Sequence, residues 1–160
     1  MNIRIGHGID IHQLKNNIPL TLAGINIKSN VGIAGHSDGD IVIHALVDAI
    51  LGALSKGDIG TFFPSTNENW RNSSSSVFLE YAKKIMHEEQ YQISNIDINI
   101  ILEKPHLNKH ILSMRKNLSK LLTIDSQNIS IKATTSDQLG FIGTKQGIMS
   151  TATILLIKKL

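Results

Sequence analysis

Apolar and polar residues alternate near the start of the chain. Over residues 3–14, the odd positions from Ile5 to Ile11, His7 among them, point one way, and the even positions from Gly6 to Leu14 point the other. This period of two predicts a β-strand. The small residues Gly6 and Gly8 leave the second face of that strand open to a bulky partner.

The rest of the chain contains segments of both periodicities. The apolar stretch from Ile41 to Leu54 is long enough for a buried helix, and Ser37 followed by Asp40 resembles a capping box before it. The serine run 73–76 is interpreted as a loop and N-cap of the next helix. In chain order we expect a strand pair over 19–27 turning near Ala23-Gly24, a loop over 28–35, helices over about 38–55 and 75–89, a strand over 93–102, a helix over 108–122, and strands over 129–135 and 148–157.

This order of elements predicts the α+β class. We expect one catalytic domain over residues 1–160, with helices packed on one face of a mixed β-sheet. The other face of the sheet would then expose apolar side chains unless another subunit covered it. Oligomerisation is therefore expected.

Composition restricts the setting and the chemistry. The 160 residues include no cysteine, and no apolar run approaches the roughly 20 residues that a bilayer requires. The first residues show no signal-peptide pattern. We expect a soluble cytosolic protein in which any metal is held by histidine and carboxylate ligands.

The net charge of +3 and the pI near 9.2 suit a nucleic acid or a phosphorylated ligand. They equally suit a helix with a solvated basic face. Aromatic residues make up only 4% of the chain, which gives little support to base stacking. The basic residues concentrate at Lys109, Arg115, Lys116, Lys120, Lys158 and Lys159.

Three residues can form a metal site. Asp10 and His12 lie two apart on the predicted strand and therefore leave the same face. His44 lies within the apolar helix, where each ring nitrogen needs a partner and a metal ion can be one of them. One Asp and two His with a fourth position open are typical of catalytic zinc. The simpler interpretations are an exposed strand face with incidental polar residues and a buried histidine satisfied by hydrogen bonds.

Asp40, His44 and Asp48 fall at i, i+4 and i+8 of the same predicted helix and form one polar stripe. We expect Asp40 and Asp48 to support the metal ligands from behind or to lie on the surface. His36 and Ser37 precede this helix, whose unpaired backbone N–H groups favour an anion such as phosphate. Ser37 is expected to cap the helix as well.

The segment 132–137, Lys-Ala-Thr-Thr-Ser-Asp, ends a predicted strand in a cluster of hydroxyl groups. Together with the Lys132 cation, these groups suit phosphate oxygens, and the Asp137 carboxylate suits a hard cation such as magnesium. Thr and Ser at a strand end are also ordinary turn formers. Two short glycine-framed loops, 57–60 and 140–143, let a ligand approach the backbone, but neither is a nucleotide-binding fingerprint.

Four motifs occur in one order and spacing: residues 6–12 (GHGIDIH), residues 35–40 (GHSDGD) with His44, residues 57–60 (GDIG), and residues 132–135 (KATT) with Leu139-Gly140-Phe141. Together they resemble the 2-C-methyl-D-erythritol 2,4-cyclodiphosphate synthase family along essentially the whole chain. The resemblance implies a chorismate-mutase-like fold and a homotrimer with active sites between neighbouring subunits. It also implies a lyase of non-mevalonate isoprenoid biosynthesis in the bacterial cytosol. The implied reaction converts 4-diphosphocytidyl-2-C-methyl-D-erythritol 2-phosphate to the 2,4-cyclodiphosphate with release of CMP.

The resemblance implies a role for individual residues. Asp10, His12 and His44 match the zinc ligands, and His36 and Thr135 match the pair that stabilises the transition state. A second divalent cation, magnesium or manganese, is implied on the substrate diphosphate with Asp137 as a ligand. The implied substrate-binding positions are Asp10, His12, His36, Ser37, Asp58, Ile59, Gly60, Phe63, Pro64, Ser65, Thr66, Asn67, Leu102, Glu103, Lys104, Pro105, His106, Leu107, Asn108, Thr134, Thr135, Ser136, Asp137, Phe141 and Thr144.

Within that set, Asp58 and Gly60 match the loop that holds the erythritol hydroxyls. Residues 102–108 match the cytidine pocket supplied by the neighbouring subunit, and residues 134–137 match the segment that contacts the diphosphate. The chain departs from the family pattern at three places. Asp137 stands where Glu is usual, residues 65–67 (STN) replace an acidic loop, and Thr144 stands where Arg is common.

Two other functions fit parts of the pattern. A basic nucleic-acid-binding domain with a structural metal fits the pI but gives no reason for an open three-ligand site beside a phosphate-binding helix start. A metal-dependent phosphohydrolase would use the same ligands to activate water, although the adjacent His-Asp pair of the common all-helical enzymes is missing. We expect a cytidine-diphosphate substrate and other copies of the chain as partners, without nucleic acid or membrane.

Overall fold

The computed structural model describes residues 2–35, 37–70 and 73–159. Its strands are β1 (Ile3–Asn16), β2 (Leu20–Leu22), β3 (Ile25–Ile27), β4 (Val31–Ile33), β5 (Tyr91–Ile101), β6 (Ile129–Thr134) and β7 (Gly147–Lys158). The α-helices are α1 (Ile41–Ala53), α2 (Ile59–Phe62), α3 (Ser75–Glu88), α4 (Ile111–Leu122) and α5 (Gly140–Gly143). Single 3₁₀ turns cover Glu68–Trp70, Asn108–His110 and Ser126–Asn128.

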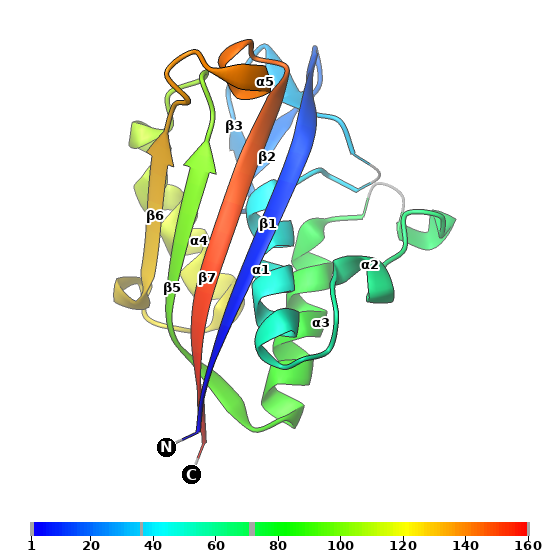
Figure 1. Cartoon of the computed structure of the whole chain (residues 1–160), viewed down its shortest axis with the longest axis vertical. Coiled ribbons are helices and arrows are strands. Elements are labelled where there is room, and N and C mark those ends of the chain that lie inside the picture. Colours follow the sequence, from blue (N-terminus) through cyan, green and yellow to red (C-terminus); the bar gives the residue numbers. More distant parts are fainter. Residues whose placement is uncertain (1, 36, 71–72, 160) are drawn as a thin grey trace.

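The fold has two layers. Five strands form one sheet in the order β4-β1-β7-β5-β6, and helices α1, α3 and α4 lie behind it in Figure 1. Strands β5 and β6 are parallel, whereas β1 and β5 both pair with β7 in the antiparallel sense, so the sheet is mixed. This arrangement confirms the α+β prediction.

The long strands β1 and β7 pair along their whole length, from Ile3 opposite Ile157 to Gln13 opposite Gly147. The side chains of β1 alternate between an exposed and a covered face, as the period of two predicted. The separate hairpin of β2 and β3 turns at Ala23 and Gly24, both at positive φ, which confirms the predicted strand pair.

Several boundaries differ from the predictions. The segment 28–35 was expected to be a loop, but Val31–Ile33 forms β4 against the end of β1. The first long helix begins at Ile41, not at residue 38, and the third begins with a 3₁₀ turn at 108–110 before α4. None of the described helices is long and apolar enough to cross a membrane.

Helix α1 lies directly on β1 because the strand presents glycine to it. A Cβ added at Gly6 would lie 1.8 Å from the Ala49 carbonyl oxygen, and one at Gly8 would lie 2.0 Å from that of Ala45. The bulky partner of this strand face is therefore the helix backbone. Apolar residues cover most of the surface of α1 and are buried, as expected for a helix enclosed by the core.

Asp40 fixes the start of α1. It is completely buried, and Oδ1 of its carboxylate accepts hydrogen bonds from the backbone N–H groups of Val42 and Ile43. The same carboxylate also accepts from Ala23 and Gly24 in the β2–β3 turn. Burial raises the pKa of the Asp40 carboxyl to about 6, against the lowering effect of these backbone bonds.

Two predictions for this helix start were therefore wrong. Asp40, not Ser37, is the N-cap of α1. Asp40 neither lies on the surface nor supports the metal ligands, because its carboxylate joins the hairpin to the helix.

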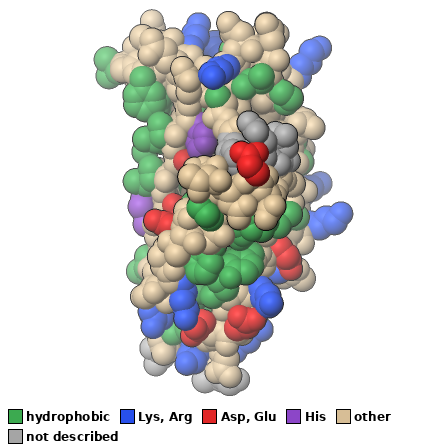
Figure 2. All heavy atoms as spheres, turned by 90° about the vertical axis from the view of Figure 1, so that its right-hand side faces the viewer, with side chains coloured by type: hydrophobic (Ala, Val, Ile, Leu, Met, Phe, Trp, Pro, Cys, Tyr) green, Lys and Arg blue, Asp and Glu red, His purple; other side chains and the backbone are tan. Residues whose placement is uncertain are grey.

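The face of the sheet away from the helices is open in this single chain. Along β1, Ile5 is 71% exposed, and Ile9 and Ile11 are about half exposed. In Figure 2, where the sheet is viewed edge-on, a row of green apolar side chains lies along the left margin of the molecule. The uncovered apolar face predicted from the sequence is present.

Close packing of α1 on β1 predicts that Gly8→Ala destabilises the protein by about 1–3 kcal/mol, because the new methyl group would collide with the helix backbone. Urea unfolding measures the change. The matched control is Gly52→Ala, since a Cβ there meets nothing within 4 Å, and it is expected to stabilise α1 by about 0.5–1 kcal/mol. Equal stability of the Gly8→Ala and parent proteins would contradict the close approach.

Candidate metal centre and adjoining pockets

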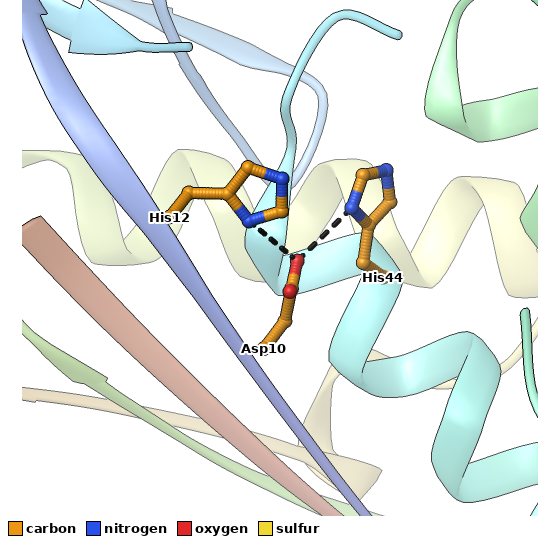
Figure 3. Close-up of side chains that lie close together, drawn as sticks. All are labelled: Asp10, His12 and His44. Carbon is orange, nitrogen blue, oxygen red and sulfur yellow. Dashed lines mark hydrogen bonds and ion pairs between the residues drawn. The ribbon is translucent and has the colours of Figure 1, made fainter. Parts of the chain in front are cut away.

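Three side chains converge where β1 meets α1. Figure 3 shows Asp10 and His12 projecting from β1 and His44 from α1, all toward one another. Oδ2 of Asp10 lies 3.1 Å from Nδ1 of His12 and 3.0 Å from Nδ1 of His44. One ligand atom from each residue can be chosen so that all three lie within 4.8 Å of one another. The convergence predicted from the sequence is confirmed.

The local folding explains this placement. Asp10 and His12 share a strand face because side chains alternate, and the glycine contacts of β1 bring α1 close enough for His44 to reach them. The rings of His12 and His44 lie 5.7 Å apart, and the His44 ring also lies beside Phe78. The ligand set therefore depends on strand–helix packing.

The donor set fits a metal ion. Nδ1 of His12 is buried and makes no hydrogen bond with acceptable geometry among the described residues, although the Asp10 carboxylate lies 3.1 Å away. A cation shared by the three residues would satisfy this nitrogen. One carboxylate and two imidazoles match the ligand types of zinc. The residues thus fit the ion that the sequence predicted.

The charge of Asp10 favours the same conclusion. Burial raises the pKa of its carboxyl, but the close contact with His12, the hydrogen bond with His44 and the charges of both rings outweigh that effect and bring the pKa from the usual 3.8 to about 2. Asp10 is consequently an anion throughout the neutral range, as a metal ligand must be.

A cavity of about 270 Å³ adjoins the three ligands. Its wall combines polar groups, among them the three candidate ligands, with aromatic side chains, one of which, Phe78, lies beside the His44 ring. The lining residues are Asp10, His12, Ser37, His44, Asp48, Ile59, Gly60, Phe63, Ser65, Trp70 and Phe78. A small ligand with a polar end toward the metal would fit this distribution.

Asp48 holds one wall of this cavity. Its Oδ1 accepts a hydrogen bond of 2.7 Å from the backbone N–H of Ile59, the first residue of α2. Burial raises the pKa of the Asp48 carboxyl, against the lowering effect of this bond. Asp58 in turn caps α2 by accepting from Thr61 N and Oγ1, which lower its own pKa. Asp48 thus positions the loop predicted to hold a substrate.

A second, smaller pocket of about 120 Å³ lies between the ends of β5 and β6. Strand β7 lies between β5 and β1, so this pocket and the metal site occupy different parts of the sheet. Its lining residues are Leu102, Pro105, His106, Leu107, Asn108, Ala133, Thr134 and Thr135. The segments 102–108 and 134–135, singled out separately from the sequence, are therefore neighbours.

Glu103 joins these two segments. Its Oε1 accepts hydrogen bonds from Ser136 N, Ser136 Oγ and Gln138 N. Some desolvation raises the pKa of Glu103, but these bonds lower it overall. The Glu103 side chain therefore holds the Thr135–Gln138 turn, in which Asp137 and Gln138 have positive φ.

The remaining predicted positions are scattered. Phe63 and Ser65 line the metal-site cavity, with Pro64, Thr66 and Asn67 in the same loop. Lys132 is engaged in an ion pair of 2.6 Å with Asp97. Phe141 lies in α5 and Thr144 at its end, both exposed. His36 lies outside the described residues.

The sequence reasoning missed three residues near the metal ligands. Trp70 and Phe78 line the cavity, and Ser75 contacts His44. The periodicity of α3 could have placed Phe78 on its buried face, but nothing local distinguishes Ser75 from the other serines in its run.

A mixed sheet backed by helices, with a candidate three-ligand metal site beside a polar and aromatic cavity, is typical of an α+β protein that acts on small molecules. Comparison with known sequences is more specific. Residues 3–157 match the model of the YgbB family. The chain belongs to this family.

Two relatives cover nearly the full chain. The 2-C-methyl-D-erythritol 2,4-cyclodiphosphate synthase of Brachyspira hyodysenteriae is 50% identical over 157 residues, which are 98% of this chain and 99% of that protein. The enzyme of the same name from Shewanella sediminis is 43% identical over 158 residues, covering 99% of this chain and 98% of that protein.

Solved structures agree with the sequence comparison. IspF of Plasmodium falciparum in a CDP complex superposes with a TM-score of 0.89 at 44% identity, covering 99% of this chain and 98% of that one. The bifunctional IspDF of Campylobacter jejuni has a TM-score of 0.95 at 38% identity, covering 99% of this chain and 43% of that one.

The metal site predicts that added Zn²⁺ raises the midpoint of thermal unfolding. An ion that binds only the folded state at 100 times its Kd adds about 2.7 kcal/mol of stability. His12→Ala removes one ligand and should abolish most of this rise. The control is His87→Ala, which changes an exposed histidine at the end of α3. A zinc response that survives His12→Ala unchanged would contradict the site.

Proposed function

We propose that the protein converts 4-diphosphocytidyl-2-C-methyl-D-erythritol 2-phosphate to 2-C-methyl-D-erythritol 2,4-cyclodiphosphate and CMP. It is a phosphorus–oxygen lyase of non-mevalonate isoprenoid biosynthesis, and residues 1–160 form its single catalytic domain. The convergence of Asp10, His12 and His44 beside a ligand-sized cavity carries the proposal. The identity of 50% to a protein named 2-C-methyl-D-erythritol 2,4-cyclodiphosphate synthase, over nearly the full length of both chains, supports it.

In this reaction an oxygen of the substrate 2-phosphate attacks the β-phosphorus of the diphosphate. The bond from that phosphorus to the bridging oxygen breaks, and the oxygen leaves with CMP. Asp10, His12 and His44 would hold zinc, and Asp137 would help to hold a second divalent ion, magnesium or manganese. Bound there, the two ions would supply charge neutralisation and polarisation of the phosphates. The protein chiefly positions the reacting groups.

The polypeptide supplies the remaining interactions. His36 and Thr135 stabilise the transition state, Ser37 contacts the phosphates near the metal, and residues 58–60 with the 63–67 loop hold the erythritol part. Asp48 supports this arrangement by fixing the Ile59 backbone. Residues 102–108 bind the cytidine base, residues 134–137 contact the diphosphate, and Phe141 and Thr144 complete the substrate set.

The site is shared between subunits of a homotrimer. In one chain, the metal-site cavity and the β5–β6 pocket are lined by different residues on different strands. The substrate needs a metal site at one end and a pocket for its base at the other. Both ends can be bound together if the base pocket comes from a neighbouring subunit. The open face of β1, with Ile5, Ile9 and Ile11, supplies an apolar surface for that association.

Departures from the family pattern at three places, five residues in all, tune the reaction in this chain. Asp137 is one methylene shorter than the usual Glu, so its hold on the second ion is weaker or passes through a water molecule. Ser65, Thr66 and Asn67 carry no charge where acidic residues are common. Thr144 stands where Arg is common in the family and thereby removes a cation, and Lys145 is the neighbouring positive charge in the sequence.

Incubation of the purified protein with the proposed substrate, Zn²⁺ and Mg²⁺ is expected to give the cyclic diphosphate and CMP. Mass spectrometry identifies both products, and His44→Ala should reduce their formation by at least 100-fold because a metal ligand is lost. A linear phosphate product would instead identify a phosphohydrolase. Intact substrate at full zinc occupancy would contradict the proposal.

Asp48→Ala tests the support of the substrate loop. Loss of one charge-assisted hydrogen bond to Ile59 N costs about 1.5 kcal/mol, which should raise KM about 10-fold. Steady-state kinetics measure KM, and zinc affinity should change much less. Glu88→Ala is the control because Glu88 is an exposed carboxylate on α3. An unchanged KM in Asp48→Ala would exclude this role.

A further inference from the structure

Ser75 occupies an unusual place in the serine run 73–76. It is completely buried, whereas Ser76 is half-buried and the exposed Ser74 acts as the N-cap of α3. The hydroxyl Oγ of Ser75 lies 2.9 Å from Nε2 of His44. It also donates to Oδ1 of Asp38, in a short hydrogen bond. Ser75 therefore bridges a metal ligand and a carboxylate.

The directions of these two bonds follow from the metal site. Nδ1 of His44 faces Asp10 and is the nitrogen available to a metal. A neutral imidazole that coordinates through Nδ1 carries its proton on Nε2. That N–H donates to Ser75 Oγ, and because the serine hydrogen goes to Asp38, the Oγ lone pairs are free to accept it. Each donor in this chain of hydrogen bonds thus has an acceptor: the N–H of His44 Nε2 donates to Ser75 Oγ, and the Ser75 hydroxyl donates to the Asp38 carboxylate.

Asp38 is itself held in place. Its Oδ2 accepts the backbone N–H of Ser75 at 3.0 Å, its Oδ1 accepts that of Asp40 at 3.2 Å, and its own N–H donates to Ser73 O. The carboxylate cannot turn away from Ser75 without losing these bonds. Ser37 Oγ offers His44 Nε2 a longer contact of 3.2 Å, so Ser75 is the closer partner.

We propose that Ser75 and Asp38 are positioning residues for the metal. Through Ser75, Asp38 fixes the tautomer and orientation of the His44 ring, so that Nδ1 is presented to the ion. The inference rests on the metal site proposed above. It gives α3 a function at the metal centre, because Ser75 is the first residue of that helix.

Metal affinity measured on the full-length protein tests this proposal. Competition with a chromophoric chelator gives the Zn²⁺ Kd, and the absorption spectrum of the Co²⁺ form reports ligand geometry. Ser75→Ala and Asp38→Asn should each weaken Zn²⁺ binding by about 10- to 100-fold and shift the Co²⁺ bands. In the Ser75→Ala background, Asp38→Asn should add no more than twofold, because Asp38 acts on His44 through Ser75. Ser76→Ala should bind within twofold of the parent protein.

Circular dichroism of the metal-free proteins separates folding from positioning. If Ser75→Ala does not fold, the Zn²⁺ Kd and the Co²⁺ spectrum of Asp38→Asn test the proposal instead. Parent-like Zn²⁺ affinity and Co²⁺ spectrum in a folded Ser75→Ala protein would overturn the proposal, as would full additivity of the two substitutions. A parent protein that binds neither ion would reject the metal site itself, which is a different outcome from unchanged variants of a metal-binding parent.

Discussion

The contact between the glycines of β1 and the backbone of α1 is the constraint on which the site depends. Gly6 and Gly8 let the helix approach until the Ala45 and Ala49 carbonyls lie where side chains would otherwise be. This approach brings His44 within 3.0 Å of Asp10, and the buried Asp40 carboxylate secures the start of the same helix against the β2–β3 turn. The three candidate ligands come from β1 and α1, which are distant in the sequence. They form one site because the close packing of the strand on the helix allows neither element to shift relative to the other.

The site can be divided into what the sequence predicts and what only packing decides. Asp10 and His12 were predictable because a strand repeats every two residues, and the helical period placed His44 with Asp48. The buried position of Asp40 could not be predicted, because its carboxylate accepts hydrogen bonds from Ala23 and Gly24, which are seventeen and sixteen residues away in the sequence. Similarly, Val31–Ile33 is too short to show a period and is a strand only because the end of β1 pairs with it. The bridge through Ser75 depends on a contact from α3 to α1, which no local pattern encodes.

The two pockets divide the chemistry between different parts of the sheet. Two carboxylates and two imidazoles from β1 and α1 line the first pocket, whereas the pocket at the ends of β5 and β6 has no carboxylate among the described residues that line it and includes two threonine hydroxyls. If the site is shared between subunits as proposed, assembly is a condition of the proposed activity. The apolar face of β1 and the candidate metal ligands on its other face would then serve the same reaction from opposite sides of one strand.

The pairing of β1 with β7 also brings the start of β1 and the end of β7 together. Ile3 lies opposite Ile157, at the lower end of the sheet in Figure 1. The metal ligands Asp10 and His12 lie toward the other end of the same strand. A short peptide could therefore join the two ends, and new termini could be opened in an exposed loop, without any strand losing its partner. The fold should therefore tolerate circular permutation. The geometry of its candidate metal site does not depend on the order of the strands along the chain.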